Sequence, residues 1–100
     1  MILVRDIFQL RFGKAREATK LFQEGMDKMK NMSNSPLRLL TDLTGPYYTL
    51  VMESTFENLT EFEKYFKNET ADPEWKSWYQ KFVPLVESGR REIFNIIEFK

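Results

Sequence analysis

The spacing of apolar residues changes between two and 3.6 residues along this chain, and the order of these changes restricts the possible folds. Residues 2–12 alternate as a β-strand does, with apolar side chains at most even positions: Ile2, Val4, Phe8, Leu10 and Phe12. Gly13 ends this segment. Residues 14–32 then carry apolar side chains at helical spacing, with charges on the opposite face. The chain is therefore predicted to begin with a strand and a helix.

The middle of the chain has the pattern of a β-hairpin. Residues 31–36 are rich in Asn, Ser and Pro, which predicts a loop, and a second strand is predicted over residues 37–43. Turn residues at 44–46 separate it from residues 47–56, which are rich in aromatic and β-branched side chains. Because the turn is short, these two strands are predicted to pair in an antiparallel hairpin.

A broken helix is predicted to follow the hairpin. Asn58 and Glu61 have the spacing of a capping box, in which the Asn side chain accepts hydrogen bonds from the first free N–H groups of a helix. A break near residues 71–73 precedes a second helical piece, with Pro73 in its first turn. This piece is predicted to extend to Glu87.

The chain is predicted to close with a strand. Gly89 is a candidate C-cap of the preceding helix, and residues 90–99 form the last apolar-rich segment. The resulting order is β-α-β-β-α-β. It predicts a single ferredoxin-like α+β domain over residues 1–100, with a four-stranded antiparallel sheet and its helices on one face.

The second face of this sheet is predicted to be too apolar for a monomer. If the even positions of the first and third strands face the helices, several large side chains remain on the other face: Leu3, Ile7, Val51, Ile93 and Ile97. Monomers avoid contiguous exposed patches of this kind. We therefore expect a homodimer in which two sheets pack face to face around a twofold axis.

The charge balance argues against two classes of partner. Lys and Arg number 15, as do Asp and Glu, and the sequence pI is near 6.3. Nucleic-acid binding would require a basic stripe and a membrane surface a polybasic patch, so neither partner is expected. No apolar run approaches the length of a spanning helix, and Arg5 and Asp6 interrupt the N-terminus too early for a signal peptide. These features predict a cytoplasmic protein.

The chain has no Cys and no His, which narrows its chemistry. Disulfides, thiolate metal sites and thiol nucleophiles are excluded, and the commonest general base is missing. Acid–base chemistry is left to Asp, Glu, Lys and Tyr. No run of acidic residues resembles a calcium loop, and no metal or cofactor is predicted.

Two segments resemble a known group of proteins. They are residues 47–66, YYTLVMESTFENLTEFEKYF, and residues 72–96, DPEWKSWYQKFVPLVESGRREIFNI. In these the chain resembles the dimeric α+β barrel superfamily, and within it the NIPSNAP-like and antibiotic-biosynthesis-monooxygenase-like small proteins. The resemblance implies a ferredoxin-like fold and a dimer. Its haem-degrading branch holds haem iron with a His, so the absence of His disfavours that activity here.

The resemblance implies one main function and leaves an alternative open. The main function is small-molecule binding. A cofactor-independent monooxygenase- or isomerase-type enzyme that acts on an aromatic or polyketide-like compound is one protein of this kind. Its pocket would lie between the sheet and the partner subunit. The alternative is a non-catalytic homodimeric binding or assembly protein whose barrel is packed shut. Whether the protein is an enzyme at all is left open by the sequence.

The candidate site residues are polar side chains expected near the open face of the sheet. Glu53 is the candidate catalytic base, and Arg5, Arg11, Tyr47 and Asn95 are the candidate ligand-binding residues. Asp42 belongs to the same polar set. The alternative is that these residues form Arg–carboxylate pairs at the dimer interface, with Tyr47 in ordinary cross-strand packing.

Aromatic residues gather in the predicted final helix. Trp75, Trp78, Tyr79 and Phe82 follow helical spacing and form one stripe, which is typical of a buried face. A ligand site is therefore expected across the sheet from them, between the subunits. Arg90 and Arg91 could bind an anion, although the upstream helix C-terminus also favours cations there.

Overall fold

Four antiparallel strands form a single sheet in the computed structural model, which describes residues 1–29 and 37–99. The strands are β1 (Ile2–Leu10), β2 (Leu37–Thr41), β3 (Thr49–Phe56) and β4 (Val86–Asn95), in the spatial order β2-β3-β1-β4. This is the predicted ferredoxin-like α+β arrangement, with β1 and β3 at its centre. The predicted hairpin is confirmed by the antiparallel pairing of β2 with β3.

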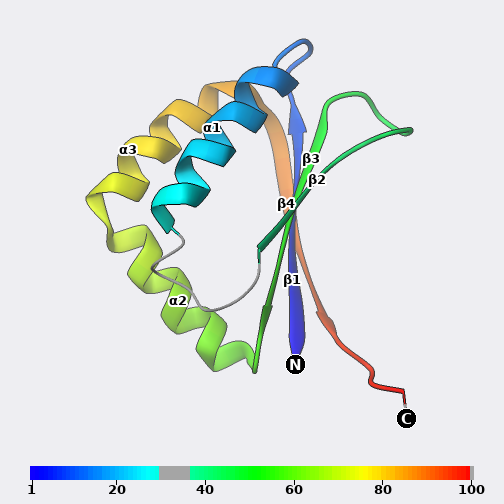
Figure 1. The fold of residues 1–100 in the computed structure, drawn as a ribbon, viewed down its shortest axis with the longest axis vertical. Coiled ribbons are helices and arrows are strands. Elements are labelled where there is room, and N and C mark those ends of the chain that lie inside the picture. The colour runs from blue at the N-terminus through cyan, green and yellow to red at the C-terminus, as the bar shows by residue number, and fades with distance from the viewer. Residues whose placement is uncertain (30–36, 100) are drawn as a thin grey trace.

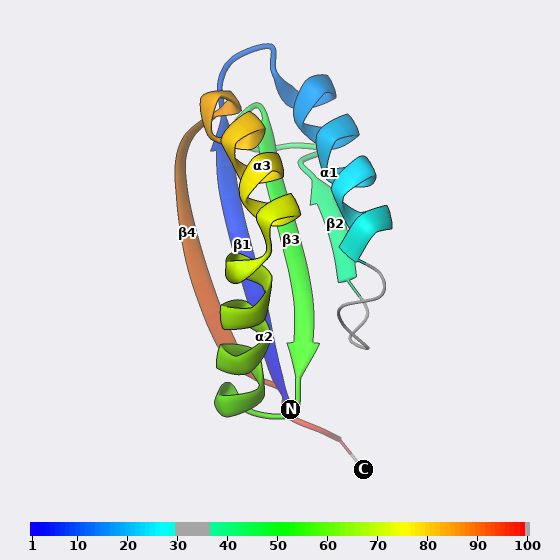
Figure 2. The same ribbon diagram turned by 90° about the vertical axis from the view of Figure 1, so that its left-hand side faces the viewer.

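The helices cover one face of the sheet and leave the other face open (Figure 1). They are α1 (Ala15–Met29), α2 (Leu59–Ala71) and α3 (Pro73–Phe82), and a short 3₁₀ turn, η1 (Val83–Leu85), leads into β4. Figure 2 shows α2 and α3 in line over β1 and β4, with α1 beside α3 over β3 and β2. The loop predicted at residues 31–36 and the end of the helix predicted to reach residue 32 lie outside the described residues.

Local sequence signals explain where the helices begin. The Asn58 side chain accepts a hydrogen bond from the backbone N–H of Glu61 at 2.9 Å, so the predicted cap of α2 is confirmed. Asp72 has extended backbone and ends α2, while its side chain caps α3 by accepting from Glu74 N–H at 2.9 Å. Pro73 then occupies the first turn of α3, where a missing N–H costs no hydrogen bond.

The final strand begins earlier than the sequence indicates. The helix predicted to reach Glu87 ends at Phe82, because Pro84 has no N–H to continue an α-helix and the chain turns through η1. Gly89 is consequently not a C-cap. It lies within β4 opposite Phe8, where an added Cβ would be 3.1 Å from Phe8 Cδ1.

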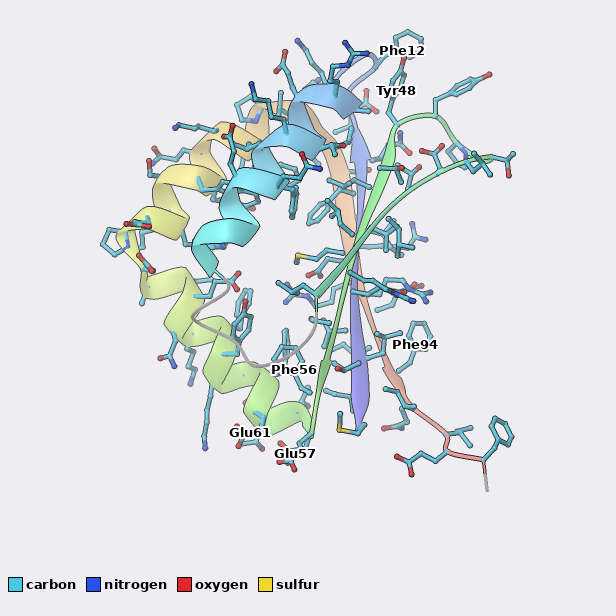
Figure 3. All side chains as sticks on the ribbon, in the orientation of Figure 1. Phe12, Tyr48, Phe56, Glu57, Glu61 and Phe94 are labelled. Carbon is cyan, nitrogen blue, oxygen red and sulfur yellow. The ribbon has the colours of Figure 1, made fainter. Side chains whose placement is uncertain are left out.

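The observed bounds and register of β4 change which of its residues lie on the open face. Ile93 pairs with Val4 and therefore shares the helix-covered face, while Ile97 lies beyond the end of β4, so both were wrongly assigned. Phe94 pairs with Leu3 and projects from the open face instead (Figure 3). The apolar residues that the register places on this face are Leu3, Ile7, Leu40, Val51 and Phe94.

The core between sheet and helices consists of two clusters. The first centres on Leu10, Ala18, Leu50 and Phe82, where β1 and β3 meet α1 and α3. The second contains Ile2, Val4, Phe56 and Phe62, at the α2 end of the sheet. Residues of both clusters line a cavity between the helices and the sheet.

Candidate functional site

A cavity of about 570 Å³ lies between the helical layer and the sheet. Side chains from β1, β3, β4 and all three helices contribute to its lining. Figure 1 shows the junction of α2 and α3 standing away from the sheet, while the outer ends of these helices approach it. The break that Asp72 and Pro73 introduce between the two helices thus shapes the roof of the cavity.

The lining of the cavity is predominantly aromatic. Its aromatic residues are Phe8, Phe22, Phe62, Tyr65, Phe66, Trp75, Trp78, Tyr79 and Phe82. Trp75 and Tyr79 stack with ring centroids 4.8 Å apart and planes inclined by 11°. The predicted aromatic stripe is therefore only partly core. All four residues line the cavity, but only Phe82 is also buried. The cavity lies on the helix-covered face of the sheet, opposite to the face where the ligand site was expected.

Trp78 is fixed in place by α1. Its indole N–H donates to the backbone oxygen of Leu21 at 2.8 Å, and its ring meets Phe22 edge to face at 4.9 Å. A Cβ on Gly25 would come within 2.6 Å of Trp78 Nε1. Gly25 is thus needed for close packing of α1 against α3, and the wall of the cavity at Trp78 is rigid.

An ion pair between a buried carboxylate and a more exposed guanidinium lies in the floor of the cavity. Asp6 is on the helix-covered face of β1 and is 7% exposed, and Arg91 is its neighbour on β4. Arg91 Nε donates to Asp6 Oδ1 at 2.6 Å, and Nη2 donates to Oδ2 at 3.3 Å. The guanidinium also lies over the rings of Phe62 and Phe66, 5.1 and 4.7 Å from their centroids. Both charges are therefore held in fixed positions.

Glu69 adds a second carboxyl group to the lining from α2. Burial raises its pKa above the ordinary value and the charge of Asp6 adds to this effect, while hydrogen bonds with Tyr65 and Trp75 and the charge of Arg91 oppose it. Burial also raises the pKa of the Tyr65 hydroxyl, which is hydrogen-bonded to Glu69. A carboxyl with a raised pKa beside aromatic side chains is a stronger base than an ordinary carboxylate, which suits it to accept and return a proton.

Arg91 was considered from the sequence as an anion-binding residue, whereas Asp6, Tyr65 and Glu69 were not candidates, although the two carboxylates carry a recognisable signal. Asp6 is the one charged residue among the even positions of a strand whose other even positions are apolar. Glu69 follows Phe62 by seven residues and Tyr65 by four, so it continues the inner stripe of α2. A charge placed on an apolar stripe must be paired or functional, and this rule could have identified both carboxylates.

The sequence-predicted base, Glu53, lies on the open face of the sheet with two arginines. Arg5 Nε donates to Glu53 Oε2 at 2.8 Å and Arg38 Nε donates to Oε1 at 3.1 Å, with a further contact from Arg38 Nη2. Although it faces away from the helices, Glu53 is only 4% exposed, because these neighbours cover it. The hydrogen bond from Arg38, followed by that from Arg5, holds the pKa of Glu53 below its ordinary value despite burial.

The other predicted ligand-binding residues do not join Glu53. Arg11 follows β1, and its Nε donates to the backbone oxygen of Pro84 at 3.0 Å. Tyr47 is 77% exposed in the connection between β2 and β3, where Asp42 accepts a hydrogen bond from Thr49 N–H. Asn95 ends β4 opposite Ile2. Of the predicted set, the structure brings together only Arg5 and Glu53, and it adds Arg38.

A second hollow of about 850 Å³ between α1 and the β2–β3 connection has no buried residue in its lining, so it is an open surface depression. Within residues 1–29 and 37–99, no three acidic side chains gather where they could hold a metal ion. No helix in this part of the chain is long and apolar enough to cross a membrane.

Comparison with solved structures finds the same fold in other proteins. An uncharacterised NIPSNAP domain protein from Burkholderia xenovorans superposes with a TM-score of 0.90 at 20% identity, covering 100% of this chain and 98% of that one. A NIPSNAP family protein from Agrobacterium tumefaciens gives 0.89 at 21% identity, with coverages of 99% and 88%. An antibiotic biosynthesis monooxygenase gives 0.75 at 11% identity, with coverages of 98% and 100%.

These similarities define the class of the protein as a ferredoxin-like α+β domain with a monooxygenase-like fold. The family model described as NIPSNAP matches residues 5–99, and the chain therefore belongs to the NIPSNAP family. The resemblance seen in the sequence is thereby confirmed. A search of the curated proteins finds no match.

Proposed function

We propose that the protein binds a small aromatic molecule in the cavity between its helices and sheet. The observation that carries this proposal is the combination of an aromatic-lined hollow with a few convergent polar groups. Its volume of about 570 Å³ falls within the range of roughly 300–1,000 Å³ typical of ligand sites. Stacked and edge-on rings around the cavity offer flat apolar surface to a planar ligand.

We further propose that the bound molecule exchanges a proton with Glu69. A cofactor-independent oxygenase or isomerase on an aromatic or polyketide-like compound must first remove a proton from its substrate. The similarity in fold to an antibiotic biosynthesis monooxygenase supports chemistry of this type. The raised pKa of Glu69 suits the carboxylate for this step, and the hydroxyl of Tyr65 beside it offers a hydrogen-bond donor. Arg91 balances Asp6 and so limits the total negative charge in the floor.

Deuterium exchange into an aromatic ketone tests this function. 2-Tetralone has acidic C–H bonds beside its carbonyl, and their replacement by deuterium in D₂O is followed by proton NMR. We expect the protein to accelerate the exchange and Glu69→Gln to abolish the acceleration while folding is retained. Glu53→Gln, on the opposite face of the sheet, should leave it unchanged. Acceleration that survives Glu69→Gln would show that another group is the base.

For Glu53 the environment favours an interface role over catalysis. We propose that the open face of the sheet packs against a second copy of the chain, with Arg5, Glu53 and Arg38 as an ion-paired group in the contact. The apolar residues around them support this proposal, since Leu3, Val51 and Phe94 gain stability when removed from water. The dimer is independent of the proposed ligand site, because the cavity lies on the other face of the sheet.

A further inference from the structure

The charges that line the cavity restrict the kind of molecule it can hold. Four charged residues contribute to the lining, namely Asp6 and Glu69 with negative charge and Arg90 and Arg91 with positive charge. They do not contribute equally to the charge inside the cavity. Arg90 has a mostly exposed side chain, and its Nε lies 3.8 Å from Glu92 Oε2 outside the cavity. The net charge inside the cavity therefore depends on Asp6, Arg91 and Glu69.

Arg91 is already occupied by protein groups. Its Nε and Nη2 both contact the Asp6 carboxylate, and the rings of Phe62 and Phe66 cover its plane. The paired geometry cancels the charge of Arg91 against that of Asp6 and uses the edge of the guanidinium that fits a carboxylate best. A carboxylate or phosphate of a ligand would have to compete with Asp6 for this position.

Glu69 has no equivalent cationic partner among the described residues. Its hydrogen-bond partners, Tyr65 and Trp75, are both neutral side chains. When Glu69 is ionised, the interior therefore carries one negative charge beyond the Asp6–Arg91 pair. Its carboxylate oxygens are acceptors only, so a ligand must supply the hydrogen-bond donor.

We propose that the cavity selects neutral or cationic aromatic molecules that present a hydrogen-bond donor to Glu69, and that it rejects aromatic carboxylates and phosphates. This inference rests on the proposed ligand site and names its substrate class. A phenolic or enolic hydroxyl would share its proton with Glu69 while the ring lies among the aromatic side chains. An anionic group would bring like charges together beside the ionised Glu69, which is unfavourable.

Three probes with the same ring system test the selection. 2-Naphthol is neutral and donates a hydrogen bond, 2-naphthylmethylamine is a cation at neutral pH, and 2-naphthoate is an anion. Isothermal titration calorimetry at pH 7.5 should show binding of the first two, with 2-naphthoate weaker by about tenfold or more, as expected for an unfavourable like-charge contact. In Glu69→Gln the difference between 2-naphthol and 2-naphthoate should shrink, because the unpaired charge is gone.

Glu63→Gln is the matched control, since Glu63 is an exposed glutamate on the same helix and does not line the cavity. It should bind all three probes as the unmodified protein does. Equal or tighter binding of 2-naphthoate by the unmodified protein would overturn the charge selection and leave the ligand site itself supported. Failure of all three probes to bind to folded protein would contradict both the selection and the proposed function.

Discussion

At the scale of single residues, the carboxyl groups of Glu53 and Glu69, on opposite sides of the sheet, have pKa values shifted in opposite directions. Two arginines hold the pKa of Glu53 below its ordinary value, while burial raises the pKa of Glu69 above it. The difference arises from their neighbours, since each residue is a glutamate on a regular element. This contrast explains why the base predicted from the sequence and the base favoured by the structure are different residues.

The pKa of Glu69 predicts a dependence of stability on pH. Because its pKa is raised in the folded state, the folded protein binds more protons than the unfolded chain above the ordinary value of 4.5. Its contribution to the free energy of unfolding should therefore fall as the pH rises from 4.5 through the folded-state pKa. Urea titrations across this range should show Glu69→Gln gaining stability relative to the unmodified protein as the pH rises. A constant difference would contradict the raised pKa.

For Glu53 the stability is expected to depend on pH in the opposite direction. Its folded-state pKa is lowered, so its stabilising contribution is present above 4.5 and is lost as the pH falls through the folded-state value. Glu53→Gln should therefore be less stable than the unmodified protein at pH 7 and approach it in acid. Urea titrations at pH 7 and in strong acid would measure this. A stability difference that grows on acidification would argue against the ion pairs with Arg5 and Arg38.

Gly25 sets the distance between α1 and the indole of Trp78. An alanine there would overpack the contact with Trp78 Nε1, which is fixed by its hydrogen bond to Leu21. Gly25→Ala should destabilise the protein by about 1–3 kcal/mol, despite the better helix propensity of Ala. Thermal unfolding of Gly25→Ala, Trp78→Phe and the double variant checks the cause. The cost of Gly25→Ala should decrease when the indole is absent, and an equal cost in both backgrounds would place the strain elsewhere.

At the scale of elements, the junction between α2 and α3 combines a structural and a functional role. Asp72 ends one helix and caps the next, and the roof of the cavity is built on both sides of it. Asp72→Ala should lower the free energy of unfolding by about 0.5–2 kcal/mol through loss of the cap. Asn58→Ala should cost a similar amount through the cap of α2, but only Asp72→Ala should also weaken 2-naphthol binding. Calorimetric titration of both variants separates the two effects.

The elements also show what the sequence could and could not predict. The order of the elements, the hairpin and the Asn58 cap follow from local signals, because the Asn58 side chain acts within three residues. The bounds of β4 depend on how Pro84 redirects the chain, and its register depends on pairing with β1, 85 residues away at Asp6 and Arg91. A shift of one residue in the register exchanges the two faces of a strand. The residues of β4 that lie on the open face could therefore not be predicted from local sequence alone. The cavity was missed for a related reason, since helical spacing alone does not distinguish a packed stripe from a cavity wall.

At the scale of the whole molecule, the sheet separates two surfaces with different proposed uses. The helix-covered face contains the cavity, and the open face contains the apolar residues and ion pairs proposed for dimerisation. Figure 3 shows one of these apolar residues, Phe94, on the open face. Val51→Asp should dissociate the proposed dimer, because it would bury a carboxylate beside Ile7 and Leu40. Analytical ultracentrifugation at micromolar concentration measures this. A monomer for the unmodified protein, or an intact and stable Val51→Asp dimer, would contradict the proposed interface.

The central claim is that the ligand site lies under the helices, and the two tryptophans allow a direct measurement of it. Trp75 and Trp78 both line the cavity, and neither lies on the open face. Two-dimensional ¹⁵N–¹H NMR during titration with 2-naphthol should shift both indole N–H signals, together with the amides of Glu69 and Arg91. Amides of Ile7 and Val51 should respond less. Shifts confined to the open face, with both indole signals unchanged at saturation, would contradict the account.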